Sequence, residues 1–363
     1  TPTPTPTPPT GGEPERAPPT AKDDPPLRDD DTVWAGAEMM GTRFSIKVWV
    51  DLSAGQTPRA AGRAVEDAFA EIDRLEQVAS EWRPDSELSR FNDRAGLGWV
   101  PLSDDLHAIL ARSKLVAQSS GGAFDPTFHG VGQLWSFVPG ARPPPPEQIE
   151  KGLALVNWRE LVLEDADAGK RGQLGKPGMK LGLGAIAKGY AVDRASALLR
   201  ARDFPHHIVE GGGDTYVSGT KGGASWMVGI QDPDSSGGGT VGALPVRDRA
   251  VVTSGGYQRF FEHEGTRYTH ILDPRTGWPL DESSSARSVT VVADDATNAD
   301  AYCTAVMVMG PAEGLRFIEG MSALEAVIIP RDGPIMVSSG LRASYVPAPG
   351  KPLPPGIEPA RAP

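Results

Sequence analysis

The chain has 363 residues, a formal net charge of −11 and a single cysteine, Cys303. The acidic balance argues against nucleic acid as a partner, because such binding needs a basic surface that neutralises phosphates. One cysteine excludes a disulfide within the chain. No apolar run of the sequence approaches the roughly 18–20 residues that a membrane-spanning helix needs.

Both ends differ in composition from the middle. Residues 1–31 open with TPTPTPTPPT and continue with Pro, Gly and charged residues, and residues 347–363 are similar. Such segments have too little apolar surface to offset the entropy cost of ordering. We therefore expect both to be disordered, the first acting as a stiff spacer because of its prolines. Residues 32–346 are expected to form one globular domain.

The sequence starts at Thr1 and not at Met. Two explanations fit this start: an upstream segment has been removed, or the sequence begins at an arbitrary boundary. Because a spacer follows, we expect an exported protein of the periplasm or cell envelope, held at the inner membrane by a tether upstream of Thr1, as in a lipoprotein.

The first half of the domain shows three regular patterns. Residues 42–50 alternate apolar and exposed positions, which predicts a half-buried strand. Residues 58–80 place apolar side chains at helical spacing, and Pro84 lies just beyond the end of this helix. A second helix is predicted over residues 106–117, with Ser103 as its N-cap.

Three features lie around these helices. The pair Met39-Met40 is interpreted as core, because thioethers fill irregular gaps well. Trp82 is expected to pack against the body, with contact to a flat ligand as the alternative. Residues 123–127 are predicted to form an extended turn, because Pro126 excludes the helical region for Asp125.

The second half has the pattern of an antiparallel sheet. From residue 208 on, segments with strand composition are joined by turns, and a helix over 300–309 interrupts them. The fold class is therefore α+β, with antiparallel sheets flanked by helices. The candidate strands span residues 208–216, 226–231, 250–253, 267–272, 288–293, 326–329 and 335–338.

The stretch LGLGAIAKGYAVD, residues 181–193, is the most informative one. An apolar strand over 179–183 is predicted to run into Gly184, where a helix begins and glycine supplies backbone angles that side chains do not tolerate. The first N–H groups of a helix have no internal partner and favour an anion, and Lys188 adds positive charge. We therefore expect a phosphate-bearing ligand here.

Gly182, Gly184 and Ala187 also fit the spacing of a dinucleotide-binding motif, and Glu210 lies at the sequence distance expected for an acid that binds the ribose. A doubly wound domain would alternate strands and helices. Strands instead follow one another after Glu210, until about Thr297. The sequence therefore disfavours a Rossmann fold.

Two further groups of residues have chemical interest. His270 ends a predicted strand, where a neutral imidazole can accept a proton near pH 7, and Asp273 is expected to form a turn. Asp300 and Thr304 are four residues apart in a helix, so their side chains point the same way. A hard cation such as Mg²⁺ would suit this pair together with backbone carbonyls. Taken alone, the two residues favour a structural interpretation, with Asp300 as a negative charge at the N-terminus of the helix and Thr304 as a residue that only occupies space.

Together these motifs resemble the FAD:protein FMN transferases of the ApbE family. That family has an α+β, T-fold-like architecture, binds FAD and Mg²⁺, and moves FMN from FAD to a Thr or Ser hydroxyl of an acceptor flavoprotein, releasing AMP. The resemblance implies the same for this chain, with a membrane-linked redox protein as acceptor. It covers most of residues 38–310 through nine segments in order: MMGTRFSI, SEWRPDSELSRFN, GGAFDPT, LGLGAIAKGYAVD, VEGGGD, WMVGIQDP, VVTSGGYQR, THILDPRTG and NADAYCTAVMVMG.

The resemblance also implies roles for residues. The metal would be bound by the main-chain oxygen of Ala185 and by the side chains of Asp300 and Thr304, and His270 would be the base for the acceptor hydroxyl. Trp82 stands where the family often has a tyrosine beside the flavin. The residues expected to line the FAD are Met40, Trp82, Ala123, Phe124, Asp125, Lys188 and Ile271.

Two positions depart from the family pattern. Gly182 stands where an aspartate usually touches FAD, which bears on FAD affinity. Cys303 replaces a small residue, and it matters only if its sulfur turns toward the ion. Two other functions stay open: an FAD pyrophosphatase that forms FMN and AMP, and a non-catalytic FAD-binding protein.

Overall fold

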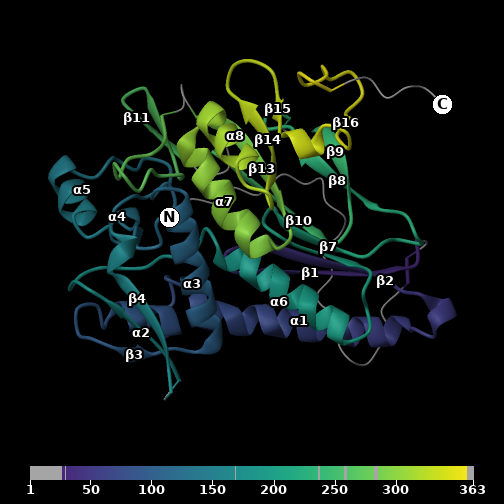
Figure 1. Ribbon diagram of the computed structural model, residues 1–363, viewed down its shortest axis with the longest axis horizontal. Coiled ribbons are helices and arrows are strands. Elements are labelled where there is room, and N and C mark those ends of the chain that lie inside the picture. The colour runs from purple at the N-terminus through teal and green to yellow at the C-terminus, as the bar shows by residue number, and fades with distance from the viewer. Residues whose placement is uncertain are drawn as a thin grey trace, which may run out of the picture.

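The computed structural model describes residues 27–28, 30–167, 169–235, 238–256, 260–281 and 285–357. Its centre has three layers: a group of helices, an eight-stranded sheet and a three-stranded sheet (Figure 1). Neighbouring strands within the sheets pair antiparallel. The predicted α+β class is confirmed.

The eight-stranded sheet has the order β1-β2-β6-β7-β10-β13-β14-β15. Side chains alternate between its two faces, so that in β10 Val252 faces the helices and Val251 faces the small sheet. The strands are β1 (Thr32–Met39), β2 (Thr42–Trp49), β6 (His207–Gly211), β7 (Asp214–Ser218), β10 (Arg249–Gly255), β13 (Ala286–Ala293), β14 (Glu325–Pro330) and β15 (Met336–Val337).

Helices cover one face of this sheet, with α7 lying across β10 and β13 (Figure 1). In α1 the Thr57 hydroxyl accepts a hydrogen bond from Ala60 N at 3.2 Å, and Pro58 occupies the first turn. Its buried stripe follows the helical spacing read from the sequence. The helices of this layer are α1 (Pro58–Ala79), α3 (Asp104–Ser119), α6 (Ala187–Ala201), α7 (Ala296–Met309) and α8 (Pro311–Glu319).

The small sheet covers the other face and consists of β8 (Trp226–Gln231), β9 (Thr240–Val246) and β16 (Val346–Pro347). Tyr345 donates a hydrogen bond to Val241 O at 3.1 Å, and Lys351 forms an ion pair of 2.6 Å with Asp232. Residues 347–357, which begin the Pro-rich tail expected from the sequence, therefore lie against this layer.

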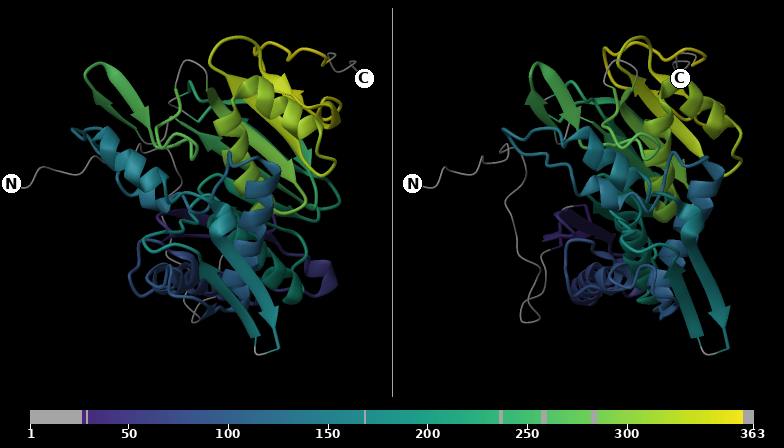
Figure 2. Two further views of the ribbon diagram at one scale, coloured as in Figure 1. Left: turned by 60° about the vertical axis from the view of Figure 1, so that its left-hand side comes forward. Right: turned by 90° about the vertical axis from the view of Figure 1, so that its left-hand side faces the viewer.

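Smaller elements lie at the edge of the three layers. The hairpin β11–β12 projects from the molecule near α5 (Figure 2), and Phe261 of β11 and Tyr268 of β12 pack together with Trp135. These outer elements are α2 (Glu87–Asn92), β3 (Val100–Pro101), α4 (His129–Gly132), α5 (Pro146–Leu153), β4 (Leu161–Ala166), β5 (Gly169–Leu174), β11 (Phe260–His263), β12 (Thr266–Thr269) and the 3₁₀ helices η1 (Leu52–Ala54), η2 (Trp158–Glu160) and η3 (Ser339–Leu341).

Several predicted boundaries were wrong. The single strand expected over 208–216 is divided into β6 and β7 by Gly212 and Gly213, which have φ values of 60° and 97° and form the two-residue hairpin turn. Residues 179–183 form no strand of the described sheets, and only Lys180 makes a bridge, with Phe128. The helix expected at residue 300 begins at Ala296.

Part of the expected N-terminal spacer, residues 1–26 and 29, lies outside the described residues. Among the helices that the structure describes, none is both long enough and apolar enough to cross a membrane.

Candidate active site

Lys188 lies between two buried carboxylates. Its Nζ is 2.8 Å from Asp214 Oδ2 and 3.1 Å from Asp300 Oδ2, and both aspartates are 2 % exposed. The lysine comes from the first turn of α6, Asp214 from the first residue of β7 and Asp300 from the second turn of α7. Three elements that are distant in sequence thus meet at one ammonium group.

This cluster carries two negative charges and one positive charge when all three groups are ionised. Burial opposes the charged form of Lys188, but the two carboxylates outweigh burial and raise its pKa. Burial and the nearby Asp300 together raise the pKa of Asp214 well above its usual range, although Lys188 acts in the opposite direction. With both carboxylates ionised, this nearly dry site has an excess of negative charge, which favours a cation.

A third carboxylate, Glu81, lies at the segment that leads into α6. Its Oε2 accepts a hydrogen bond from Leu183 N at 3.5 Å, and its pKa is raised by burial against the effect of neighbouring amides and Lys188. The N–H groups expected to hold a phosphate are therefore partly occupied by the chain itself. Gly184 does not have the positive φ expected for it, and α6 begins only at Ala187.

Helices α6 and α7 approach each other closely at Gly189. A Cβ on Gly189 would lie 2.2 Å from Ala296 O, and its N–H donates to Asp300 Oδ2 at 3.2 Å. One turn later, Asp193 accepts hydrogen bonds of 2.8 Å from Ala296 N and Thr297 N at the start of α7. Glycine at position 189 therefore allows the Asp300 carboxylate to reach α6.

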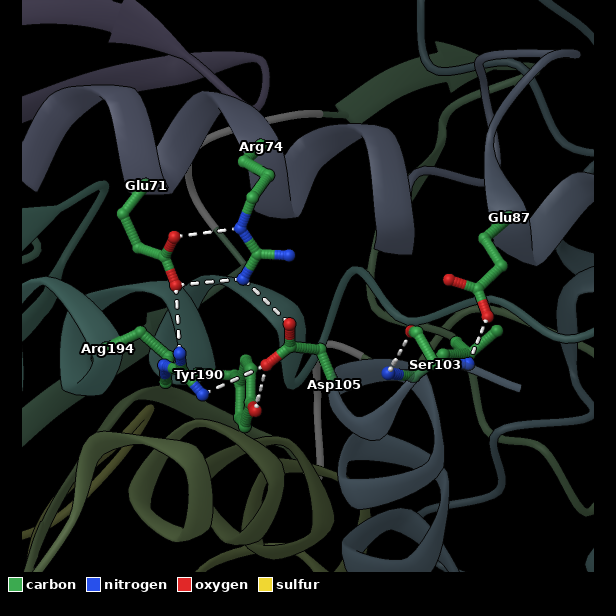
Figure 3. A network of polar contacts seen from close by, with 8 residues as sticks. Glu71, Arg74, Glu87, Ser103, Asp105, Tyr190 and Arg194 are labelled. Carbon is green, nitrogen blue, oxygen red and sulfur yellow. Dashed lines mark hydrogen bonds and ion pairs between the residues drawn. The ribbon is translucent and has the colours of Figure 1, made fainter. Parts of the chain in front are cut away.

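A network of arginines and carboxylates fixes α6 on α1 and α3 (Figure 3). Asp105 accepts hydrogen bonds from Tyr190 Oη at 2.7 Å, Arg74 Nη2 at 2.7 Å and Arg194 Nη1 at 3.0 Å. Glu71 binds Arg74 through two contacts of 2.8 Å and pairs with Arg194 at 3.1 Å. The two arginines balance the two carboxylates. The network therefore fixes α6, the helix that carries Lys188.

The start of α3 appears in the same view. Ser103 Oγ accepts a hydrogen bond from Leu106 N at 3.2 Å, which confirms the predicted N-cap, and Ser103 N donates to Glu87 Oε1 at 2.7 Å (Figure 3). The helix itself begins at Asp104, earlier than predicted.

Thr304 follows Asp300 by one turn of α7 and is half-buried. Asp300 lies within the helix and binds Lys188 and Gly189, so the interpretation as a helix N-terminal charge is wrong. Across the described residues, no hydrogen bond involves the Thr304 hydroxyl. The hydroxyl of Thr304 and the carboxylate of Asp300 are both hard oxygen donors, which fit Mg²⁺.

The sequence predicted two side-chain ligands for the metal, Asp300 and Thr304, and a main-chain oxygen as the third. In the part of the chain that the structure describes, no group of three or more His, Cys, Asp or Glu side chains is placed to hold a metal.

Cys303 faces the sheet. Its Sγ donates a hydrogen bond to Val289 O at 3.0 Å, and burial raises the pKa of the thiol to about 12. The thiol is therefore a protonated contact between α7 and β13.

Trp82 is 75 % exposed, so the expectation that it packs against the body was wrong. Its ring meets the His129 ring almost perpendicularly, with centroids 5.5 Å apart.

Met40 packs partly on the main core, as predicted, but in an unusual conformation. It has a φ of 50° in the turn between β1 and β2, and its N–H donates to Glu76 Oε2 at 2.9 Å. A non-glycine residue in this region is strained, and such strain is often found at functional sites.

The predicted FAD-lining residues 123–125 form a buried turn. The side chains of Ala123 and Phe124 are 1 % and 4 % exposed and belong to the main core. The Asp125 carboxylate accepts hydrogen bonds from Thr127 N at 2.8 Å and Trp158 N at 3.1 Å. The side chains of this turn are therefore engaged within the protein.

His270 directly follows β12, as expected for a residue at a strand end, and its ring lies edge-on to Phe137 with centroids 6.4 Å apart. The next residue, Ile271, is 9 % exposed and packs on the main core. The predicted turn at Asp273 is confirmed, because Asp273 Oδ1 accepts from Arg275 N at 2.8 Å.

Residues 40–328 match the ApbE family. The chain belongs to the ApbE family. A relative from Treponema pallidum (strain Nichols), named FAD:protein FMN transferase, is 34 % identical over 316 residues, which cover 84 % of this chain and 86 % of the relative. A relative of the same name from Klebsiella pneumoniae (strain 342) is 30 % identical over 280 residues, covering 77 % and 86 %.

Solved ApbE structures have the same fold. The ApbE protein from Thermotoga maritima superposes with a TM-score of 0.76 at 30 % identity, covering 86 % of this chain and 99 % of the other. The flavin transferase ApbE from Vibrio cholerae superposes with a TM-score of 0.73 at 27 % identity and the same coverage.

Sequence reasoning about this ApbE chain missed Asp214, Glu81 and Gly189 as parts of the site. A signal for Asp214 was present: alternation in the strand after the glycine run puts it on the same face as Tyr216, which packs on the main core. A carboxylate on a core face needs a cation partner. For Gly189 the signal is absent, because close approach of two helices depends on their crossing in three dimensions.

Proposed function

We propose that this ApbE-family chain transfers the FMN moiety of FAD to a Thr or Ser hydroxyl of an acceptor protein and releases AMP. The observation that carries the proposal is the buried cluster of Lys188, Asp214 and Asp300 beside the start of α6. The relatives named FAD:protein FMN transferase support it.

In this reaction the P–O bond between the two phosphates of FAD breaks, and a P–O bond forms between the FMN phosphorus and the acceptor oxygen. AMP leaves with the bridging oxygen. The hydroxyl proton passes to a base, for which we propose His270. Phosphoryl transfer depends mainly on positioning and on neutralising charge, so it suits a site whose groups are held rigidly.

We propose that Lys188 shares the neutralisation of the diphosphate with a bound cation, because its ammonium is itself paired with Asp214 and Asp300. Asp214 and Asp300 hold its ammonium in one place, so little reorganisation is needed when FAD binds. For the metal we propose Mg²⁺, held by Ala185 O and by the side chains of Asp300 and Thr304. When bound there, the ion would polarise the diphosphate and neutralise part of its charge.

We propose that the flavin nucleotide binds beside the C-terminal end of α1. Trp82 offers an exposed ring there, and the strained turn at Met40 is tied by Glu76 to the same helix. The main chain of 123–125 and Ile271 complete the proposed lining.

The proposal is tested by incubating the protein with FAD, Mg²⁺ and a candidate acceptor domain from a membrane-linked redox protein. Flavin bound covalently to the acceptor, with one AMP released per flavin, is the expected result. FMN and AMP without flavinylated acceptor would instead indicate an FAD pyrophosphatase. FAD that stays bound and unchanged would indicate a flavin-binding protein without turnover.

We also propose that the protein works at the cell envelope, near its acceptor. The composition of residues 1–31, rich in Pro and Thr, supports a spacer that gives the domain reach. Fractionation of cells that produce the full-length protein, with immunodetection in the periplasmic, membrane and cytoplasmic fractions, checks this location.

A further inference from the structure

His129 fills a space that exists because residue 182 is glycine. A Cβ on Gly182 would lie 3.0 Å from His129 Cβ and 3.3 Å from its Nδ1. The two chain segments are held together at this point, since Gly182 N donates to Pro126 O at 2.9 Å and Lys180 bridges to Phe128. The position of the imidazole against the bare main chain is therefore fixed by the backbone.

The imidazole supports the exposed indole of Trp82. The two ring planes are at 87° with centroids 5.5 Å apart, so the contact covers at most one face of the indole. With Trp82 75 % exposed, most of the indole surface is open to a ligand. The indole is thus oriented by a neighbouring ring but left largely uncovered.

The imidazole also has unused hydrogen-bonding capacity. Throughout the described residues, no hydrogen bond or ion pair involves the ring nitrogens of His129. Burial, with a smaller effect of Lys180, lowers the pKa of His129 to about 4. The ring is therefore neutral at physiological pH and offers one donor and one acceptor nitrogen.

We propose that His129 is a further FAD-contacting residue of this chain: it orients Trp82 so that an indole face receives a planar nitrogen heterocycle of FAD, and its imidazole hydrogen-bonds to the edge of that heterocycle. This inference rests on the proposed function, because it assumes FAD as the ligand. Two rings of FAD have the required chemistry, the isoalloxazine and the adenine.

The test is the dissociation constant of FAD, measured by isothermal titration calorimetry for the wild type and two variants in the presence of Mg²⁺. His129→Ala removes both the ring and the nitrogens, and we expect affinity to fall about tenfold, the size of one ring contact or one hydrogen bond. His129→Phe keeps the ring, and we expect it to recover part of this loss. Titrations with riboflavin and with AMP show which ring is held, because only one of them should weaken in His129→Ala.

The chain provides a matched control. Trp49 and His206 also form a perpendicular-type pair with centroids 5.5 Å apart, at the end of β2 opposite to Met40. His206→Ala should leave FAD affinity unchanged. A double variant with Trp82→Ala adds a second readout: if His129 acts partly through Trp82, the effects of the two substitutions are not additive.

Each outcome decides the matter. FAD affinity within twofold of the wild type in both His129 variants would overturn the inference, as would equal losses in His129→Ala and His206→Ala. A wild-type protein that binds FAD but flavinylates no acceptor would contradict the proposed transfer and leave the binding comparison valid. A wild-type protein that binds no FAD would overturn both.

Discussion

Lys188 Nζ lies 2.8 Å from Asp214 Oδ2 and is the link between Asp214 on the sheet and Asp300 on α7. Each carboxylate is buried, so neither can be solvated by water if the ammonium is removed. The three groups therefore act as one electrostatic unit, and each substitution in it has a different consequence.

Lys188→Met is expected to destabilise the protein much more than Asp214→Asn. Without the ammonium, two carboxylates are left in a dry site, and we expect the free energy of unfolding to fall by about 3–5 kcal/mol. Asp214→Asn leaves the pair of Lys188 and Asp300 intact, and we expect a loss of about 1 kcal/mol. Urea unfolding at pH 7 measures both values, and equal losses would show that the three groups do not act as a unit.

Gly189→Ala is expected to separate α6 from α7. The added methyl group would lie 2.2 Å from Ala296 O, a backbone atom that cannot rotate away, so we expect a loss of about 1–3 kcal/mol in stability. Gly130→Ala is the control, because no atom lies within 4 Å of its added Cβ. Thermal unfolding of the two variants should differ clearly. Equal melting temperatures would contradict the close approach.

His207 is expected to make stability fall in mild acid. Burial lowers its pKa to about 4, and its ring nitrogens lie 2.8 Å from Ser196 Oγ and 2.7 Å from Phe204 O. As pH falls from the usual value of about 6.5 toward 4, the unfolded chain takes up a proton and the folded chain does not. The free energy of unfolding therefore falls over this range, by about 3 kcal/mol in total.

His207→Gln removes this titration. Its free energy of unfolding should depend less on pH between 4 and 6.5 than that of the wild type, with similar slopes above pH 7. Denaturant unfolding at half-unit steps of pH measures the difference, and parallel curves would rule out His207 as the source.

His270→Ala is expected to lower flavin transfer by about 10²–10⁴-fold, the usual contribution of a general base. FAD binding should persist, because the proposed role concerns the acceptor hydroxyl. The assay measures flavinylated acceptor over time and, separately, the dissociation constant of FAD. Transfer at the wild-type rate would remove His270 from the mechanism.

Asp300→Asn is expected to raise the Mg²⁺ concentration needed for half-maximal transfer at least about tenfold. The amide retains the shape of the side chain but carries no charge, so the proposed metal site loses its only carboxylate ligand. A metal titration of activity, with thermal unfolding to confirm folding, measures the effect. An unchanged Mg²⁺ dependence would refute the metal assignment.

The sequence predicted the fold class and the long periodic elements well, because periodicity depends on local alternation alone. The helix over 58–80 and the strand over 226–231 agree closely with α1 and β8. Strand β1, the helix α8 and the strands β3 to β5 were missed. Strand β3 has only two residues, and β5, with the sequence GKRGQL, is too polar to show an apolar alternation.

The candidate site was only partly predictable. Lys188 and Asp300 were singled out, and they are in direct contact. Exposure of Trp82 and the occupation of the Leu183 amide by Glu81 were not foreseen, because both depend on where the end of α1 meets the segment before α6. Such contacts between distant segments have no signature in local composition.

The position of Cys303 has a practical consequence for labelling. The chain's one thiol is 0 % exposed, so maleimides and disulfide reagents should not reach it in the native protein. Its pKa is raised to about 12, so the reactive thiolate is also disfavoured. A cysteine placed at an exposed position such as Leu97, which is 60 % exposed, would then be the only reactive thiol. Spin labels or fluorophores could be attached to the native background without removing any residue.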